Sequence, residues 1–145
     1  MVLVSACILG IRCRYDGSAR KLNSIRKISD VIMIPVCPEL LGGLPTPRPE
    51  AFFTGGDGGA VIKGRAFVRD TLGRDVTQAF LKGAEEIHAI ARDLKIGHAL
   101  LKERSPSCGT HKVWVEGHLQ DGIGVTAAVL KVMGVHLMNE DGLIR

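Results

Sequence analysis

The stretch PVCPELLGGLPTPRP, residues Pro35–Pro49, is the one around which the rest of the chain is organised. It follows the apolar run Val31–Val36, which predicts a buried strand, so the stretch leaves the carboxyl end of that strand. Prolines fix φ and glycines relax it, and we therefore expect a shaped loop and not a continued helix. A thiol (Cys37) and a carboxylate (Glu39) stand two residues apart on this stiff loop. Their position at a strand end predicts a functional site.

The composition is typical of a single α/β domain. A chain of 145 residues can bury roughly two-thirds of its unfolded surface without disulfides or metals to staple it. Hydrophobic residues make up 46% of the sequence and aromatic residues only 4%, which predicts a core of Val, Ile, Leu and Ala. No internal repeat or low-complexity segment divides the chain, so we expect one domain over residues 1–145.

Strands and helices alternate along the sequence. Four apolar runs predict strands: Val2–Ala6, Val31–Val36, His98–Lys102 and Val135–Met138. Three segments predict helices: a weak one over Lys21–Ser29, a strong one opened by Asp75 and ended by Gly97, and one over Asp121–Met133 closed by Gly134. Asp75 is the N-cap candidate of the strong helix, because Gln78 three residues on completes a capping-box pattern. The strands do not alternate polar with apolar residues, as expected when both faces of a sheet are covered. We predict a three-layer domain whose mainly parallel, Rossmann-like sheet is flanked by helices.

The segment between the proline-rich loop and the strong helix carries a weaker pattern. Thr54–Gly59, reading TGGDGG, is expected to be mobile or tightly turned. Ala60–Lys63 and Arg65–Arg69 flank Gly64 and have a β-like composition. They predict a small hairpin or flap.

Three cysteines lie at or just past the carboxyl ends of predicted central strands. Cys7 follows the first strand, Cys37 follows the second, and Cys108 lies in the loop ERSPSCGT after the third. Ligands bind at this edge of open α/β sheets, so these three residues are expected to meet in space. The fourth cysteine, Cys13, sits in a loop between two arginines and is a weaker candidate. No CxxC pair is present, and nothing supports a zinc ribbon.

Thiols grouped in this way indicate a metal site, although a buried small hydrophobe is the ordinary fate of a free cysteine. Sulfur donors favour an iron–sulfur cluster, zinc or Cu(I). With three protein ligands one coordination position stays open, as in catalytic sites. Glu39 would stand beside it as a carboxylate able to activate water. Ser105 and Ser107 could orient a polar substrate, and for Ser107 turn chemistry is the preferred interpretation.

The charge pattern argues against nucleic acid as a partner. The net charge is +4 and the isoelectric point about 9.0, with the only dense basic stretch between Arg12 and Lys27. Aromatic residues, which single-strand binders use to stack bases, are not interleaved with it. The stretch is interpreted as a solvated face or as a basic rim around a pocket for a polar or anionic small molecule.

The amino terminus, MVLVSACILG, favours a cytoplasmic protein without a membrane span. It has no charged n-region, and its apolar run is too short for a signal peptide or a transmembrane helix. In a reducing compartment, cysteines serve as ligands, nucleophiles or buried fillers more often than as disulfides.

The motifs together resemble the thiouracil desulfidase family, formerly a domain of unknown function. Five of them carry the resemblance: SACILG (Ser5–Gly10), CRYDG (Cys13–Gly17), PVCPELLGGLPTPR (Pro35–Arg48), DVTQAFLKGAE (Asp75–Glu85) and LKERSPSCG (Leu101–Gly109). They stand in the expected order over nearly the whole chain, which corresponds to a short form without a fused second domain.

The resemblance implies an oxygen-sensitive [4Fe-4S] cluster held by Cys7, Cys37 and Cys108. The iron without a protein ligand would bind the sulfur of a thiocarbonyl such as that of 2-thiouracil. Water activated by Glu39 would attack the carbon, sulfide would leave onto the iron, and Ser105 would assist in positioning or proton transfer. In preparations made in air the cluster is expected to be lost or replaced by zinc. The resemblance does not indicate an oligomeric state.

Three alternative functions remain open at the level of sequence. The chain could be a non-catalytic module that binds zinc or a cluster. It could be a metal-free enzyme with Cys108 as its nucleophile. A role in tRNA modification is the fourth hypothesis, and the missing aromatic patch counts against it.

Overall fold

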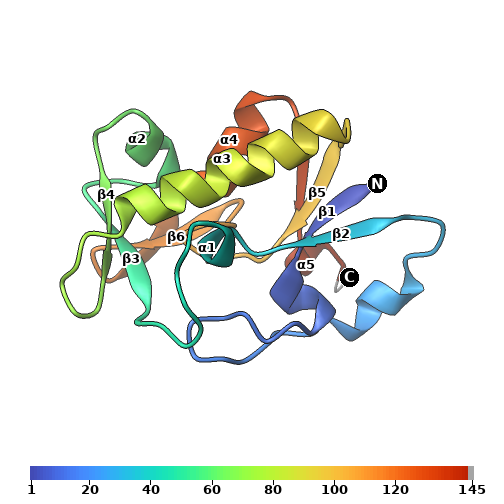
Figure 1. Ribbon diagram of the computed structural model, residues 1–145, viewed down its shortest axis with the longest axis horizontal. Coiled ribbons are helices and arrows are strands. Elements are labelled where there is room, and N and C mark those ends of the chain that lie inside the picture. Colours follow the sequence, from blue (N-terminus) through green and yellow to red (C-terminus); the bar gives the residue numbers. More distant parts are fainter. Residues whose placement is uncertain (144–145) are drawn as a thin grey trace.

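Four short apolar strands form an all-parallel sheet in the computed structural model, which describes residues 1–143 (Figure 1). They are β1 (Val2–Ser5), β2 (Met33–Val36), β5 (His98–Leu101) and β8 (His136–Asn139), in the spatial order β2-β1-β5-β8. Each neighbouring pair is parallel. The four predicted strands and their mainly parallel arrangement are confirmed, and the α/β fold class with them. The second strand begins at Met33, because Val31 and Ile32 are exposed.

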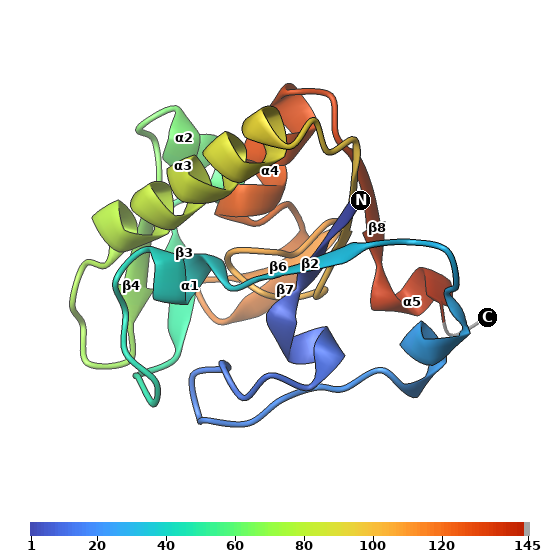
Figure 2. The same ribbon diagram turned by 45° about the vertical axis from the view of Figure 1, so that its right-hand side comes forward.

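Both faces of this sheet are buried, as expected for parallel strands that do not alternate. Leu3 of β1 packs beneath helix α3 (Thr77–Asp93), and the next residue, Val4, packs on the opposite side against the amino-terminal segment. Figure 2 shows α3 and α4 (Val125–Val132) on one side of the sheet. The 3₁₀ helices η1 (Ala6–Leu9) and η2 (Asn23–Lys27) lie on the other side.

A second four-stranded sheet, in the order β4-β3-β6-β7, lies beside the first. The sequence predicted only one of its strands, because the β-like piece Arg65–Arg69 overlaps β4. Its strands are β3 (Ala51–Thr54), β4 (Phe67–Asp70), β6 (Lys112–Val115) and β7 (His118–Asp121). Two antiparallel pairs, β3 with β4 and the hairpin β6 with β7, are joined by a parallel contact between β3 and β6. The tight β6–β7 turn places Glu116 and Gly117 at positive φ, as primed hairpin turns require.

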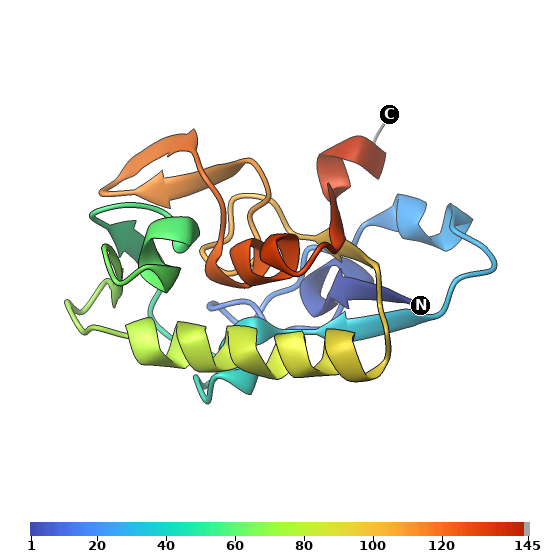
Figure 3. The ribbon, with the colours of Figure 1, turned by 90° about the horizontal axis from the view of Figure 1, so that it is seen from above.

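Helix α3 joins the two sheets along its length (Figure 3). Its first half contributes Phe80 and Ala84 to the core above the second sheet. Its second half contributes Ile87 and Ala91 to the core above the first sheet. The strong helical periodicity seen in the sequence is therefore one continuous apolar face that covers two separate cores.

Several predicted boundaries are corrected by the structure. The Pro35–Pro49 segment contains a short helix, α1 (Pro38–Leu41), because proline at the first helical position is compatible with a helix start. Ala60–Lys63 is not β-like: helix α2 (Gly58–Ile62) forms there, since the Asp57 carboxylate accepts the Ala60 N–H and caps it.

Two helix starts and the amino-terminal helical segment also differ from prediction. Helix α3 begins at Thr77, whose N–H donates to the Asp75 carboxylate at 2.9 Å, so that Val76 and not Asp75 is its N-cap. Helix α4 begins at Val125, because Asp121 belongs to β7. The weak helix over Lys21–Ser29 is only the 3₁₀ turn η2.

The described part of the chain ends in a short helix, α5 (Glu140–Leu143), directly after β8. Within residues 1–143, none of the helices combines the length and the apolar character that crossing a bilayer requires.

Candidate functional site

A pocket of about 620 Å³ opens at the carboxyl edge of the parallel sheet. Cys7 lies in η1 directly after β1, and Cys37 directly follows β2. Cys108 lies in the loop after β5. All three line the pocket, which is where their strand-end positions predicted them, and their role as ligands stays a prediction. Cys13, the weaker candidate, lines the same pocket.

The four thiols differ in the pKa that their surroundings impose. Burial raises the pKa of Cys7 to about 11, although nearby Lys102 opposes the shift. Burial also raises the pKa of Cys108. The Cys37 thiol donates to the carbonyl oxygen of Cys13 at 3.9 Å. The Cys13 side chain is the main influence that lowers the pKa of Cys37 to about 7, and Cys37 in turn raises the pKa of Cys13. Buried thiols of high pKa become thiolates only when a cation compensates them, and a metal centre would supply that charge.

Glu39 is held in the pocket by two partners that sequence reasoning did not single out. Arg48 Nε donates to its Oε1 at 3.2 Å, and the Ser107 hydroxyl donates to its Oε2 at 3.2 Å. Arg48 is itself buried and donates to the carbonyl oxygen of Cys13 at 2.9 Å and to the Thr46 hydroxyl at 3.0 Å. One guanidinium thus joins the proline-rich loop, the Cys13 loop and the carboxylate.

The two serines of the SPSC turn differ in their contacts, and the expected role of Ser105 stays a prediction. The Ser105 hydroxyl oxygen accepts the N–H groups of Ser107 and Cys108, both at 3.1 Å, and so closes the turn. Ser107, for which turn chemistry was preferred, is fully buried and reaches Glu39 instead. Ser105 also lines the pocket, and its O–H proton is not used in these two hydrogen bonds.

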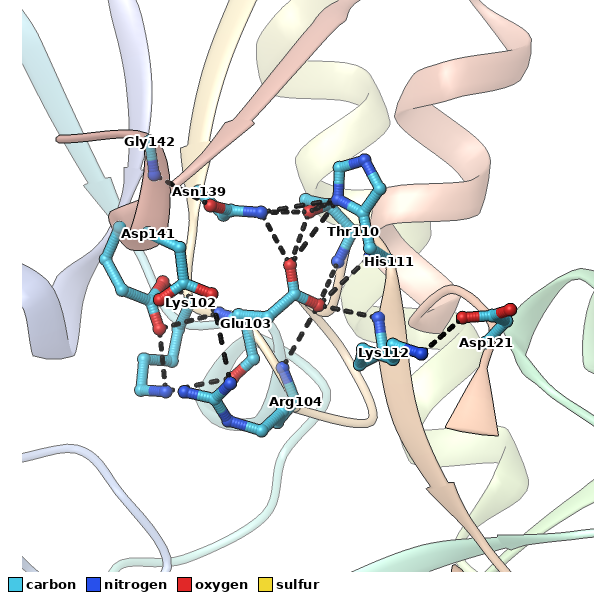
Figure 4. Close-up of polar contacts among 11 residues, drawn as sticks. Lys102, Glu103, Arg104, Thr110, His111, Lys112, Asp121, Asn139, Asp141 and Gly142 are labelled. Carbon is cyan, nitrogen blue, oxygen red and sulfur yellow. Dashed lines mark hydrogen bonds and ion pairs between the residues drawn. The ribbon is translucent and has the colours of Figure 1, made fainter. Parts of the chain in front are cut away.

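A second buried carboxylate, Glu103, braces the loop that carries Cys108 (Figure 4). Its Oε1 accepts backbone N–H groups at 2.9 to 3.3 Å, from Arg104, Thr110, His111 and Lys112. Its Oε2 accepts the Thr110 hydroxyl at 2.6 Å and the Asn139 amide at 2.7 Å. Burial alone would raise the pKa of this carboxyl, but the hydrogen bonds outweigh it and lower the pKa to about 2.

Glu140 fixes the start of the same loop. Its carboxylate accepts the Glu103 N–H at 2.8 Å and the Lys102 ammonium at 2.9 Å. Sequence reasoning missed both glutamates. Glu103 lies within the motif LKERSPSCG, which was the available signal, whereas nothing in the sequence distinguished Glu140 from a surface residue.

Among residues 1–143, no three His, Cys, Asp or Glu side chains are placed to hold one metal ion together. The three-cysteine ligand set therefore stays a prediction.

The fold is that of an α/β protein whose thiol-lined pocket, with a fixed carboxylate, lies at the carboxyl edge of the parallel sheet. The chain belongs to the 2-thiouracil desulfurase family, whose sequence model matches residues 2–142. The predicted family is confirmed, and with it the prediction of a sulfur-removing enzyme.

Two relatives are similar over nearly the full length. The uncharacterized protein YbbK of Bacillus subtilis (strain 168) is 42% identical over 147 residues, which cover 99% of this chain and 97% of that protein. Among solved structures, the [4Fe-4S]-dependent thiouracil desulfidase TudS is similar with a TM-score of 0.84 and 37% sequence identity. The match covers 99% of this chain and 92% of that chain.

Proposed function

We propose that this protein is a [4Fe-4S]-dependent desulfidase that converts the thiocarbonyl of a thiolated nucleobase such as 2-thiouracil, or of a related compound, into a carbonyl. The observation that carries the proposal is the convergence of Cys7, Cys37, Cys108 and Glu39 on one pocket. The similarity to TudS, a [4Fe-4S]-dependent thiouracil desulfidase, supports the same cofactor and substrate class.

Cys7, Cys37 and Cys108 would hold the cluster. When bound, the cluster supplies an iron Lewis acid that draws charge from the thiocarbonyl sulfur and takes up the sulfide that leaves. The raised thiol pKa values and the pocket volume are compatible with an iron–sulfur group. Cys13 is left out of the ligand set, as in the sequence-based prediction.

The overall reaction is balanced by one water molecule: the carbon–sulfur double bond is replaced by a carbon–oxygen double bond, and H₂S is released. Glu39 would take a proton from the water as its oxygen bonds to the carbon. Arg48 and Ser107 fix the orientation of the Glu39 carboxylate. The Ser105 hydroxyl would donate a hydrogen bond to the substrate, because its oxygen is already occupied by two backbone N–H groups.

Anaerobic reconstitution tests this function. Wild-type protein should bind iron and sulfide, show iron–sulfur charge-transfer absorption, and release uracil and sulfide from 2-thiouracil. Cys37→Ser should bind less iron and release neither product. Equal iron in the wild type and in this variant would contradict the three-cysteine site.

The metal-free alternative, with Cys108 as nucleophile, is disfavoured by the burial that raises the pKa of this thiol, since the thiolate is the reactive form. Full desulfidase activity after exhaustive chelation would restore that alternative. Stoichiometric metal with no turnover on any thiocarbonyl would instead favour a binding module.

A further inference from the structure

Aromatic side chains are scarce in this protein but gather at the pocket. Tyr15, Phe52 and Trp114 all line it, and Trp114 is the chain's single tryptophan. With aromatic residues at only 4% of the sequence, three in one pocket is a concentration that core packing does not explain.

Phe52 and Trp114 lie side by side on one face of the second sheet. The parallel register pairs Phe53 of β3 with Val115 of β6, and both of these residues are buried in the core. The preceding residues on each strand, Phe52 and Trp114, therefore occupy adjacent positions on the opposite face. Trp114 is 46% exposed although it is large and apolar, so this ring is available to a ligand.

The third aromatic residue, Tyr15, is already engaged. The Arg14 guanidinium lies 5.6 Å from the centre of its ring, over the ring face. Its carbonyl oxygen accepts the Arg48 N–H at 2.8 Å, which ties this loop to the residue that holds Glu39. Phe52 and Trp114 are thus the aromatic faces that remain for the substrate.

We propose that Phe52 and Trp114 form an aromatic wall that stacks against the planar ring of the substrate. This inference rests on the proposed function and deepens it: the site selects thiolated heteroaromatic rings over non-planar thioamides. Stacking of a base on an aromatic side chain changes binding by about 5-fold to 100-fold. The aromatic wall determines which substrate rings bind, whereas Glu39 and the group held by the cysteines carry out the reaction.

Two ligands that differ in planarity provide the test. Uracil and 5,6-dihydrouracil share the same amide and carbonyl groups, but only uracil has a flat conjugated ring. Calorimetric titration of anaerobic cluster-loaded protein should show that uracil binds about tenfold more tightly. Uracil should also change the Trp114 emission, which no other tryptophan contributes to.

Variants of single aromatic residues show which side chains cause the preference for uracil over dihydrouracil. Phe52→Leu and Trp114→Leu should each weaken uracil binding about tenfold and leave dihydrouracil binding unchanged. Trp114→Phe, which keeps an aromatic face, should retain most of the preference. The matched control is Phe67→Leu: Phe67 is 46% exposed and lies on the same face of the same sheet, but outside the pocket.

The proposal is overturned if wild-type protein binds uracil no better than dihydrouracil, if no uracil binding is detected, or if Phe67→Leu loses as much affinity as Trp114→Leu. Folding of each variant is checked by circular dichroism, and the Trp114 emission change in the wild type needs no variant.

Failure of the proposed function would give a different result: uracil would still bind more tightly than dihydrouracil, while 2-thiouracil would release no sulfide. If 2-thiouracil released sulfide but Phe52→Leu and Trp114→Leu bound uracil as tightly as the wild type, the aromatic wall would be contradicted and the proposed function would stand.

Discussion

Glu39 owes its place to two hydrogen bonds and to the short helix on which it stands. Arg48 is buried and acts on both the carboxylate and the Cys13 carbonyl, and Ser107 is buried against the other carboxylate oxygen. A carboxylate oriented from both sides, at a pocket lined by thiols, is suited to accept a proton from water at one defined position.

Glu39→Gln should lower kcat by about a hundredfold or more and leave the iron content unchanged, because general-base catalysis contributes roughly 10²-fold to 10⁴-fold. The measurement is the initial rate of sulfide release from 2-thiouracil, together with iron analysis. Glu50→Gln is the control, since Glu50 lines the same pocket without these contacts. If Glu39→Gln kept half of the wild-type rate, another group would have to be the base.

Cys13→Ala should raise the pKa of Cys37 in cluster-free protein. The interaction with the Cys13 side chain is the main cause that lowers the pKa of Cys37 to about 7, and alanine removes that side chain's thiol. The pH dependence of Cys37 alkylation by iodoacetamide, followed by mass spectrometry, should shift to higher pH. Cys13→Ser keeps a hydrogen-bond donor and should shift it less. A profile that does not move in Cys13→Ala would show that Cys37 is activated by other groups.

At the level of elements, the approach of α1 to α3 sets where the Cys37–Glu39 segment lies. A side chain at Gly83 of α3 would collide with the carbonyl of Pro38, and one at Gly42 would collide with the carbonyl of Ala79. These two glycines allow the backbones to touch. The helix that carries Glu39 is thereby seated directly on the longest helix of the molecule.

Gly83→Ala should destabilise the protein by about 1–3 kcal/mol, the range for overpacking a filled interior, even though alanine is the better helix former. Urea unfolding followed by circular dichroism measures the change. Gly97→Ala is the matched control, because a side chain there would meet no atom within 4 Å. Equal stability of the two variants would show that α1 moves away from α3 without cost.

Sequence reasoning succeeded for some elements and failed for others for physical reasons. The parallel strands and α3 were predicted because each carries a long apolar run or a helical repeat. Most of the second sheet was missed because its strands are half-exposed and carry no continuous apolar run, and all four residues of β7 are exposed. The three cysteines were placed correctly because each follows a strand. The contacts of Ser107 and Arg48 with Glu39 were not predicted. The contact of Ser107 with Glu39 spans 68 positions, and no local sequence pattern encodes it.

On the scale of the whole molecule, Glu103 connects the two sheets. It follows β5 of the first sheet, accepts N–H groups at the start of β6 of the second, and binds Asn139 at the end of β8. One buried carboxylate therefore fixes the loop of Cys108 and the relative position of the sheets together.

Protonation of the Glu103 carboxylate should lower the stability of the protein in acid. The pKa of Glu103 lies at about 2 in the folded protein, below its ordinary value of 4.5, so the carboxylate stabilises the fold above pH 4.5. As the pH falls from about 5 to 2, the unfolding free energy should drop by about 3 kcal/mol on its account. Glu103→Gln should be less stable at pH 7 and show a shallower acid slope in urea titrations.

The control for this prediction is Asp16→Asn, which removes an exposed carboxylate that hydrogen bonds with Ser18. It should leave both the stability at pH 7 and the acid slope almost unchanged. An acid slope in Glu103→Gln as steep as in the wild type would contradict the assignment of acid sensitivity to Glu103.

The strand order β2-β1-β5-β8 has a consequence for biosynthesis. Cys108 follows Cys37 by 71 positions, and the central strand β5 lies between β1 (Val2–Ser5) and β8 (His136–Asn139). A nascent chain on the ribosome holds Cys7 and Cys37 long before it holds the strand that completes their edge. Any metal group that the three cysteines share can therefore gain its third ligand only after Cys108 and the strand β5 before it have been synthesised.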